Sequence, residues 1–413
     1  MISAPPAAST TARTIAISDP ISLQKYLVDG TSLAWLRRGE GIIGLGCYAA
    51  TEVADAGEAD AWWSTLVEGL VHTTELPGLA VAGPVAFGSF SFDPEHTAEV
   101  SRLIVPAVII GRRNGRAWLT VVGDGNVELP TPGPALGAPV GARALDDRAE
   151  ADRWCDRVAE AVRRIESNGL EKVVLARSLT VRADQPLDVR HLVDTLATDY
   201  PSCWTYAVDG LVGASPEMLV RREGGLATSR ILAGTIRRSG SEETDLKLAG
   251  SLARSSKNLA EHELAVESVA EALAPLCSGM NVPESPYVLE LPNVLHLATD
   301  VTAVAHSDAS ALRLAAALHP SAAVCGTPTS VARAAISELE GLDRGRYSGP
   351  VGWIDAEGNG EWAIALRCGQ LDPSDPTRIE LFAGCGIVEG SDPAEELAET
   401  RAKLVPMLAA LGA

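Results

Sequence analysis

The segment Val351-Gly-Trp-Ile-Asp355, followed by Gly358-Asn-Gly360 and the apolar run from Glu361 to Gln370, predicts two strands joined by a tight turn. Asn-Gly between apolar runs is typical of a β-hairpin, because both residues tolerate the positive φ angles of a two-residue turn. A second hairpin is predicted from Ser32–Arg37 and Gly41–Gly46, which flank a short charged turn. These hairpins alternate with helical patterns, so the sequence indicates an α+β fold rather than a parallel βαβ array.

Helical periodicity is clearest in the second half of the chain. Helices are predicted over 154–165, 187–196, 244–276, 308–318, 329–340 and 392–411, and the helix over 329–340 is expected to begin at Thr329 or Ser330. In the first half only residues 62–70 have a helical pattern, and the Pro/Gly-rich residues 129–141 are a connector. We therefore divide the chain into a disordered tail (1–14), an N-terminal portion of the fold (15–145) and a C-terminal portion (146–413).

Composition restricts the partners and the compartment. The chain has 413 residues and a net charge of −20, a field that repels the phosphates of nucleic acids. No apolar run reaches the ~18 residues of a membrane span, and the start of the chain lacks the pattern of a secretory signal. Seven scattered cysteines without a CxxC motif indicate reduced thiols. We expect a cytoplasmic protein that binds neither nucleic acid nor membrane.

Two predicted helices carry similar polar pairs. Glu396 and Glu399 are three residues apart in one, and Asn258 and Glu261 are three residues apart in the other, so each pair shares a helix face. Two such pairs could hold Mg²⁺, which takes oxygen ligands. The alternative is two solvated acidic faces, which an acidic chain provides in any case.

Lys172 and Glu217 are candidates for proton transfer. Lys172 begins an apolar strand, where desolvation would favour its neutral, basic form. Glu217 lies in the tight turn Gly213-Ala-Ser-Pro-Glu217, which would hold its carboxylate in a fixed place. The alternatives are a strand-end lysine that reaches water and an exposed turn residue.

Four further residues suit an anionic ligand. Arg367 follows Ala365-Leu366 in an apolar strand and needs a partner there, such as a carboxylate. Gly384 and Gly386, at a strand end, could bring backbone N–H groups to an anion or could simply permit close packing. His296 is either a core histidine or a ligand contact.

The ordered motifs from about residue 150 onward resemble those of the chorismate-utilising enzymes, and most closely the isochorismate synthases. They include Glu-Lys-Val-Val-Leu-Ala-Arg (171–177), Gly-Ala-Ser-Pro-Glu (213–217), Leu-Ala-Gly-Thr (232–235), Glu-His-Glu-Leu (261–264), Leu-His-Leu-Ala-Thr (295–299), Tyr-Ser-Gly-Pro-Val-Gly-Trp (347–353) and Ala-Gly-Cys-Gly-Ile-Val (383–388). The resemblance implies one large α+β domain in which two antiparallel sheets pack face to face and helices cover the outside. It also implies chorismate as the substrate and Mg²⁺ as the cofactor.

The resemblance assigns a role to each candidate residue. Glu261 and Glu399 match direct metal ligands, and Asn258 and Glu396 match residues that reach the metal through water. Lys172 matches the general base that activates water, and Glu217 matches the general acid beside the departing hydroxyl. The matching substrate-binding residues are Thr235, His296, Tyr347, Arg367, Gly384, Gly386 and Lys403.

Two positions favour water over ammonia as the nucleophile. In the resembled family, ammonia-using members have a glutamine at the position of Lys172. Aminodeoxychorismate synthases have a nucleophilic lysine at the position of Ala233. No glutaminase partner is therefore expected, and we expect a monomer. The favoured hypothesis is an isochorismate synthase of menaquinone biosynthesis. A salicylate synthase, a siderophore role and a non-catalytic ligand-binding member of the fold are the alternatives.

Overall fold

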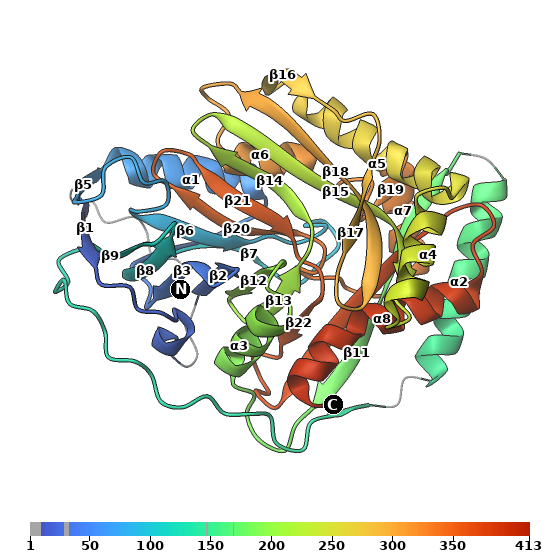
Figure 1. Cartoon of the computed structure of the whole chain (residues 1–413), viewed down its shortest axis with the longest axis horizontal. Helices are drawn as coiled ribbons and strands as arrows, with labels where there is room; N and C mark the ends of the chain where they lie inside the picture. Colours follow the sequence, from blue (N-terminus) through green and yellow to red (C-terminus); the bar gives the residue numbers. More distant parts are fainter. Residues whose placement is uncertain (1–9, 29–32, 146–147, 168) are drawn as a thin grey trace.

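The computed structural model describes residues 10–28, 33–145, 148–167 and 169–413, and folds them into two β-sheets with helices at the periphery (Figure 1). The helices are α1 (Ala56–Glu68), α2 (Arg148–Glu166), α3 (Val189–Asp199), α4 (Glu242–Leu252), α5 (Ser256–Leu273), α6 (Ala311–Leu318), α7 (Thr329–Leu339) and α8 (Pro393–Leu411). A 3-10 turn, η1, covers Gln24–Tyr26.

The larger sheet has the strand order β10-β11-β23-β22-β13-β12-β2-β3-β8-β9-β1-β5, with β19 paired to β11. Its strands are β1 (Thr10–Ile17), β2 (Leu33–Arg37), β3 (Glu40–Leu45), β5 (Leu70–Thr74), β8 (Val108–Arg113), β9 (Arg116–Val122), β10 (Arg143–Ala144), β11 (Lys172–Arg182), β12 (Trp204–Val208), β13 (Leu211–Ser215), β19 (Gly326–Thr327), β22 (Cys368–Leu371) and β23 (Arg378–Ile387). Its described pairs are antiparallel apart from β1 with β5.

The smaller sheet has the order β16-β18-β15-β14-β21-β20-β6-β7-β4, with β17 paired to β18. Its strands are β4 (Ala49–Val53), β6 (Val85–Ser89), β7 (Ser101–Val105), β14 (Met218–Glu223), β15 (Leu226–Arg237), β16 (Cys277–Asn281), β17 (Tyr287–Glu290), β18 (Val294–Ala305), β20 (Pro350–Asp355) and β21 (Gly360–Ile364). The N-terminal and C-terminal portions both contribute strands to each sheet, so they form one domain.

The two sheets pack face to face through one buried core. That core unites Trp35 and Tyr206 of the larger sheet with Phe87 and Trp362 of the smaller one. The approach is close at Gly44 of β3, where an added Cβ would lie 3.2 Å from the Phe87 ring. The predicted fold class is thus confirmed, and the apolar strands are explained by burial against the opposite sheet.

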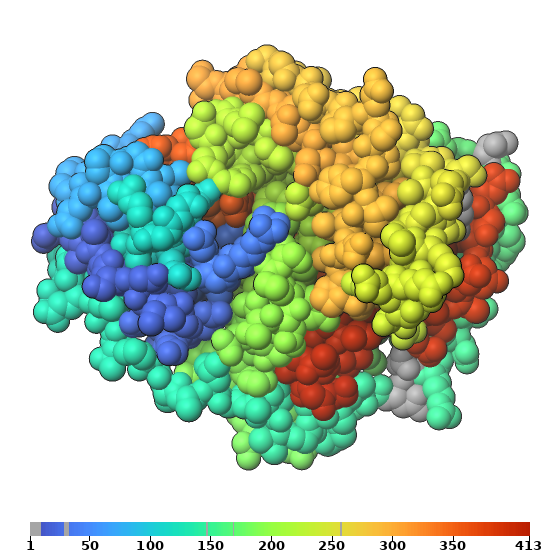
Figure 2. Space-filling view, in the orientation of Figure 1, coloured from blue at the N-terminus to red at the C-terminus, as the bar shows by residue number. Residues whose placement is uncertain are grey.

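The helices cover the sheets on the outside. α3 and α8 bury apolar residues such as Leu196 and Met407 against the larger sheet, and α5 and α6 lie against the smaller one. The space-filling view shows the yellow-green α4 segment beside the red α8 on one face (Figure 2). No helix in the described part of the chain is both long and apolar enough to cross a membrane.

Several predicted boundaries were wrong. Residues 10–14, assigned to the tail, begin strand β1, which gains a partner on each side from β5 and β9; residues 1–9 and the boundary at 146–147 lie outside the described residues. The helix predicted over 244–276 is two helices, because the chain turns at Ala253–Ser255 and Ser255 caps α5 by accepting from the Asn258 N–H. The N-cap of α7 is Pro328 rather than Thr329 or Ser330.

Candidate active site

A cavity of about 390 Å³ lies between the ends of the two sheets and the helices α5 and α8. Its size falls within the ~300–1,000 Å³ usual for small-molecule sites. It is lined by all of the predicted site residues except Lys172: Glu217, Thr235, Asn258, Glu261, His296, Tyr347, Arg367, Gly384, Gly386, Glu396, Glu399 and Lys403. The alternative of two separate, solvated acidic helix faces is therefore wrong for α5 and α8.

Glu217 and Arg367 lie where the chain crosses from one sheet to the other. Glu217 joins β13 of the larger sheet to β14 of the smaller, and Arg367 joins β21 of the smaller sheet to β22 of the larger. The two crossings bond to each other: the Ile364 N–H donates to the Glu217 carbonyl (3.1 Å), and the Ala214 N–H donates to the Arg367 carbonyl (3.2 Å). The prediction of one strand over 361–370 was wrong because the apolar run continues through this buried crossing.

The Glu217 carboxyl is buried, with 5% of the residue exposed, which excludes a solvent-exposed turn. Burial raises its pKa from 4.5 to about 7, although Lys172, Lys403 and Arg367 lower it and the Leu232 N–H donates to Oε1 at 3.5 Å. Desolvation of the carboxylate outweighs the attraction of three cations. At neutral pH this carboxyl can therefore retain the proton that a general acid must give.

Lys172 lies behind the cavity wall at the start of β11 and is 1% exposed, so its ammonium group does not reach bulk water. Its Nζ lies 3.1 Å from Glu261 Oε1 of α5. Gly386 of the neighbouring strand β23 makes room for this pair, because an added Cβ would lie 2.6 Å from Glu261 Oε1 and 2.9 Å from Lys172 Cε. A glycine is required here for close packing of the pair.

A second lysine–glutamate pair lies on α8. Lys403 Nζ is 2.6 Å from Glu399 Oε1 and also donates to the Gly384 carbonyl at 2.8 Å.

Asp392 is the N-cap of α8, because its side chain accepts from the N–H groups of Ala394 and Glu395. The sequence predicted Gly384 and Gly386 at the end of a strand. Both lie inside β23, which continues to Ile387.

Arg367 is held by a neutral histidine and keeps a free donor. Its Nη2 donates to His296 Nε2 at 3.3 Å, and His296 Nδ1 lies 3.0 Å from Thr235 Oγ1. Burial and the charges of Arg367 and Lys403 hold the pKa of His296 well below its usual value. Arg367 Nη1 is buried without a hydrogen-bond partner among the described residues, and the residue adopts a φ of +50°. A buried guanidinium N–H of this kind suits a ligand carboxylate.

Tyr347 also lines the cavity. Its ring stacks on Phe382 of β23 with centroids 5.2 Å apart. Gly384 leaves space for the phenol, since an added Cβ would lie 3.2 Å from the Tyr347 hydroxyl. Phe382 and Arg344, which also line the cavity, were not predicted. The sequence around Phe382 shows only the pattern of a strand, which does not indicate a site residue. The only sequence signal for Arg344 is that it lies three residues before the Tyr347 motif.

The oxygen donors of α5 and α8 match a hard divalent cation in ligand type. Glu261, Glu396 and Glu399 supply carboxylates, and Asn258 supplies the oxygen of its side-chain amide. The Nδ2 of the same amide donates to Ser255 Oγ at 2.8 Å. Carboxylate and amide oxygens are the ligands that Mg²⁺ prefers. As the helices stand, the carboxylates of Glu261 and Glu399 are each held by a lysine.

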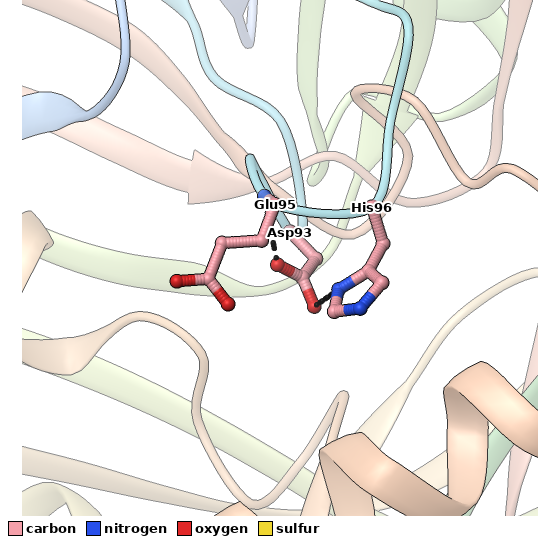
Figure 3. A group of neighbouring side chains, drawn as sticks. All are labelled: Asp93, Glu95 and His96. Atoms are coloured by element: carbon pink, nitrogen blue, oxygen red, sulfur yellow. Dashed lines mark hydrogen bonds and ion pairs between the residues drawn. The ribbon is translucent and has the colours of Figure 1, made fainter.

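A different group of possible metal ligands lies at the surface. The side-chain donor atoms of Asp93, Glu95 and His96 lie within 4.8 Å of one another (Figure 3). Asp93 already accepts from Arg333 at 2.6 Å and is 3.0 Å from His96 Nδ1. This group lies outside the cavity lining, and its Asp93 carboxylate is already engaged by Arg333 and His96.

The chain is similar to a known enzyme family and to curated proteins named isochorismate synthase. A family model described as "Chorismate binding enzyme" matches residues 138–412. Isochorismate synthase MenF of Bacillus subtilis (strain 168) is 34% identical over 360 residues, covering 81% of this chain and 76% of that protein. Isochorismate synthase DhbC of the same strain is 39% identical over 275 residues, covering 64% of this chain and 68% of that protein.

A solved structure extends the similarity over nearly the whole fold. The crystal structure of a putative 2,3-dihydroxybenzoate-specific isochorismate synthase, DhbC from Bacillus anthracis, matches with a TM-score of 0.77 and 30% identity, covering 94% of this chain and 98% of that one. These matches confirm the resemblance inferred from the sequence motifs. The chain belongs to the chorismate-binding enzyme family.

Proposed function

We propose that the protein is an isochorismate synthase, which moves the hydroxyl group of chorismate from C4 to C2. One observation supports this proposal above the others: the buried carboxyl of Glu217, with a pKa of about 7, faces the same cavity as Glu261, whose carboxylate pairs with Lys172 behind the cavity wall. An exchange of hydroxyl groups requires an acid for the leaving oxygen and a base for the entering one.

In the proposed reaction Lys172 acts as the general base and takes a proton from the water that attacks C2. Glu217 gives its proton to the C4 hydroxyl, which leaves as water, so one water enters and one departs. Arg367 and Tyr347 hold the enolpyruvyl carboxylate, supported by the free Arg367 Nη1 at the cavity wall. Thr235 and His296 bound the ring, and Gly384, Gly386 and Lys403 lie near a carboxylate.

We further propose that Glu261 and Glu399 bind Mg²⁺ directly and that Asn258 and Glu396 act on it through water. The ion would offset the charge of a dianionic substrate in an acidic protein and withdraw electron density from the ring. The oxygen-rich lining supports this assignment, and so does the need to bring an anion into a cavity that carries four glutamates on α5 and α8.

Menaquinone biosynthesis is the proposed use of the product, supported by the long match to MenF of Bacillus subtilis. The match to DhbC keeps a siderophore role as the second candidate. Deleting the gene in its host separates the two. Rescue of growth by menaquinone supports the first, and rescue by 2,3-dihydroxybenzoate supports the second.

Incubation of the purified protein with chorismate and MgCl₂, with separation of the products by chromatography, tests the activity. Isochorismate alone is expected. Salicylate with pyruvate would indicate a salicylate synthase, and the absence of turnover would indicate a ligand-binding member of the fold. Because water is the proposed nucleophile, turnover should occur without glutamine, ammonia or a second subunit, and we propose that the protein acts as a monomer.

A further inference from the structure

Two buried arginines line the cavity, and they differ in their free donors. Arg367 has an Nη1 without a partner among the described residues. Arg344, which is 4% exposed, uses all five of its N–H groups inside the protein. Nε donates to Glu340 Oε2 (2.9 Å), Nη1 to the Val324 carbonyl (2.9 Å) and Ser348 Oγ (3.2 Å), and Nη2 to the Val174 carbonyl (2.7 Å) and Glu340 Oε1. Arg344 has no N–H left for a substrate.

The Glu340–Arg344 pair completes the edge of strand β11 just after Lys172. β19 pairs with Lys172 and Val173, and β10 pairs with Val181 and Arg182. Between them, the Ala176 N–H donates to Glu340 Oε1 (2.7 Å) and the Val174 carbonyl accepts from Arg344. The two side chains therefore take the place of a neighbouring strand and fix the backbone that carries Lys172.

The same guanidinium also holds the segment that carries Tyr347 and Ser348. Ser348 accepts from Arg344, donates from Oγ to the Tyr347 carbonyl (2.7 Å) and adopts a φ of +60°. The Tyr347 N–H donates to the Arg344 carbonyl at 2.9 Å. A strained backbone of this kind persists only where its surroundings hold it, and here Arg344 provides two of the contacts. The guanidinium also packs over the Phe92 ring, 4.1 Å from its centroid.

We propose that Glu340 and Arg344 are positioning residues that fix Lys172 and Tyr347 relative to each other. The proposal rests on the proposed function only for its effect on rate. Neither residue touches the substrate: Arg344 acts through the backbone of β11 and through Ser348, and Glu340 acts through Arg344 and Ala176.

The test compares Arg344→Lys with Arg190→Lys. Arg190 is also buried and makes a two-pronged ion pair, to Asp188 at 2.8 and 2.7 Å, but α3 contributes no described residue to the cavity lining. Both substitutions keep the charge and remove the planar fork. We measure kcat and KM for chorismate at a temperature at which each variant is folded, and hydrogen exchange of peptides covering residues 172–177 and 345–349.

For Arg344→Lys we expect kcat to fall tenfold or more and both peptides to exchange faster. Arg190→Lys should change neither, and Glu340→Gln should change both in the same direction but less. If Arg344→Lys keeps the wild-type kcat, or loses no more than Arg190→Lys, the positioning role is wrong. If Arg344→Lys does not fold, Glu340→Gln decides. If the wild type does not convert chorismate, the proposed function fails, and the exchange of the two peptides still tests the positioning.

Discussion

The carboxyl group of Glu217 keeps its proton through burial, and this has a cost in stability. A pKa of about 7 in place of 4.5 means that the folded protein binds a proton that the unfolded chain has already lost. Between these pH values stability therefore falls as pH rises. Above pH 7 the cost is about 3 kcal/mol, at ~1.4 kcal/mol for each pH unit. The proposed catalytic acid is thus a source of instability in the free protein.

Replacement of Glu217 by Gln should separate these two effects. We expect kcat to fall by a factor of ~10² or more, because an amide cannot donate the proton. The free energy of unfolding at pH 8 should rise by up to ~3 kcal/mol, and this gain should shrink as pH falls toward 4.5. Urea unfolding at pH 5 and pH 8 measures it. A gain that is the same at both pH values would show that Glu217 does not carry the raised pKa.

Lys172 offers the complementary test of the base. Lys172→Ala should lower kcat by a factor of ~10² or more. The fold should remain, because Glu261, with 14% of its side chain exposed, borders the cavity and can be solvated there. Lys247→Ala is the matched control, since Lys247 is exposed and pairs with Glu243 on α4. Near-normal turnover by Lys172→Ala, with circular dichroism unchanged, would remove the base assignment.

At the scale of elements, α5 and α8 bring together carboxylates that are more than a hundred residues apart in sequence. If these helices hold Mg²⁺, Glu399→Gln should raise the Mg²⁺ concentration needed for half-maximal rate by tenfold or more, because a charged ligand is lost. Glu263→Gln removes the same charge from an exposed position on α5 and should leave the titration unchanged. An unaltered Mg²⁺ titration for Glu399→Gln would place the ion elsewhere.

Strand β23 offers a contrast between two glycines. At Gly384 an added Cβ would lie 2.5 Å from the backbone carbonyl of Leu175, whereas at Gly386 it would meet the ends of two long side chains, those of Glu261 and Lys172. Gly384→Ala should therefore lower the unfolding free energy by ~1–3 kcal/mol. Gly386→Ala should cost less stability but reduce kcat at least tenfold, because it displaces the Glu261–Lys172 pair. Urea unfolding and steady-state kinetics, measured on both variants, test this; equal effects on stability and rate in both would contradict it.

The sequence predicted the elements better than the connections between them. The hairpin at Gly358-Asn-Gly360 and the N-cap at Asp392 follow from local turn and helix chemistry, and both are present. The crossings at Glu217 and Arg367 were not predictable in this way, because a strand that ends and one that changes sheet have the same apolar pattern. The pairing of Lys172 with Glu261 depends on contacts across 89 residues of sequence, for which local periodicity gives no signal.

In the whole molecule, the cavity lies where the chain crosses between the two sheets. Glu217 and Arg367 occupy the two crossings that bond to each other, and the helices α5 and α8 border the cavity from separate sheets. Side chains at such a junction are fixed by both sheets at once. This arrangement explains how buried charges such as Arg367 and Lys172 can be retained, because each is anchored by strands whose burial does not depend on them.

The net charge of −20 acts on the substrate before any of these residues can. Chorismate is a dianion, so the overall field slows its approach, whereas Lys403 and Arg367 act only inside the cavity. Screening weakens the field beyond ~10 Å at 0.1 M salt but affects close contacts less. Raising KCl from about 10 to 200 mM at saturating Mg²⁺ should therefore increase kcat/KM about twofold and leave kcat unchanged. Steady-state kinetics across this range, with sucrose as a viscosity control, make the measurement. A kcat/KM that falls with salt would mean that the cations of the cavity, rather than the overall charge, govern the encounter.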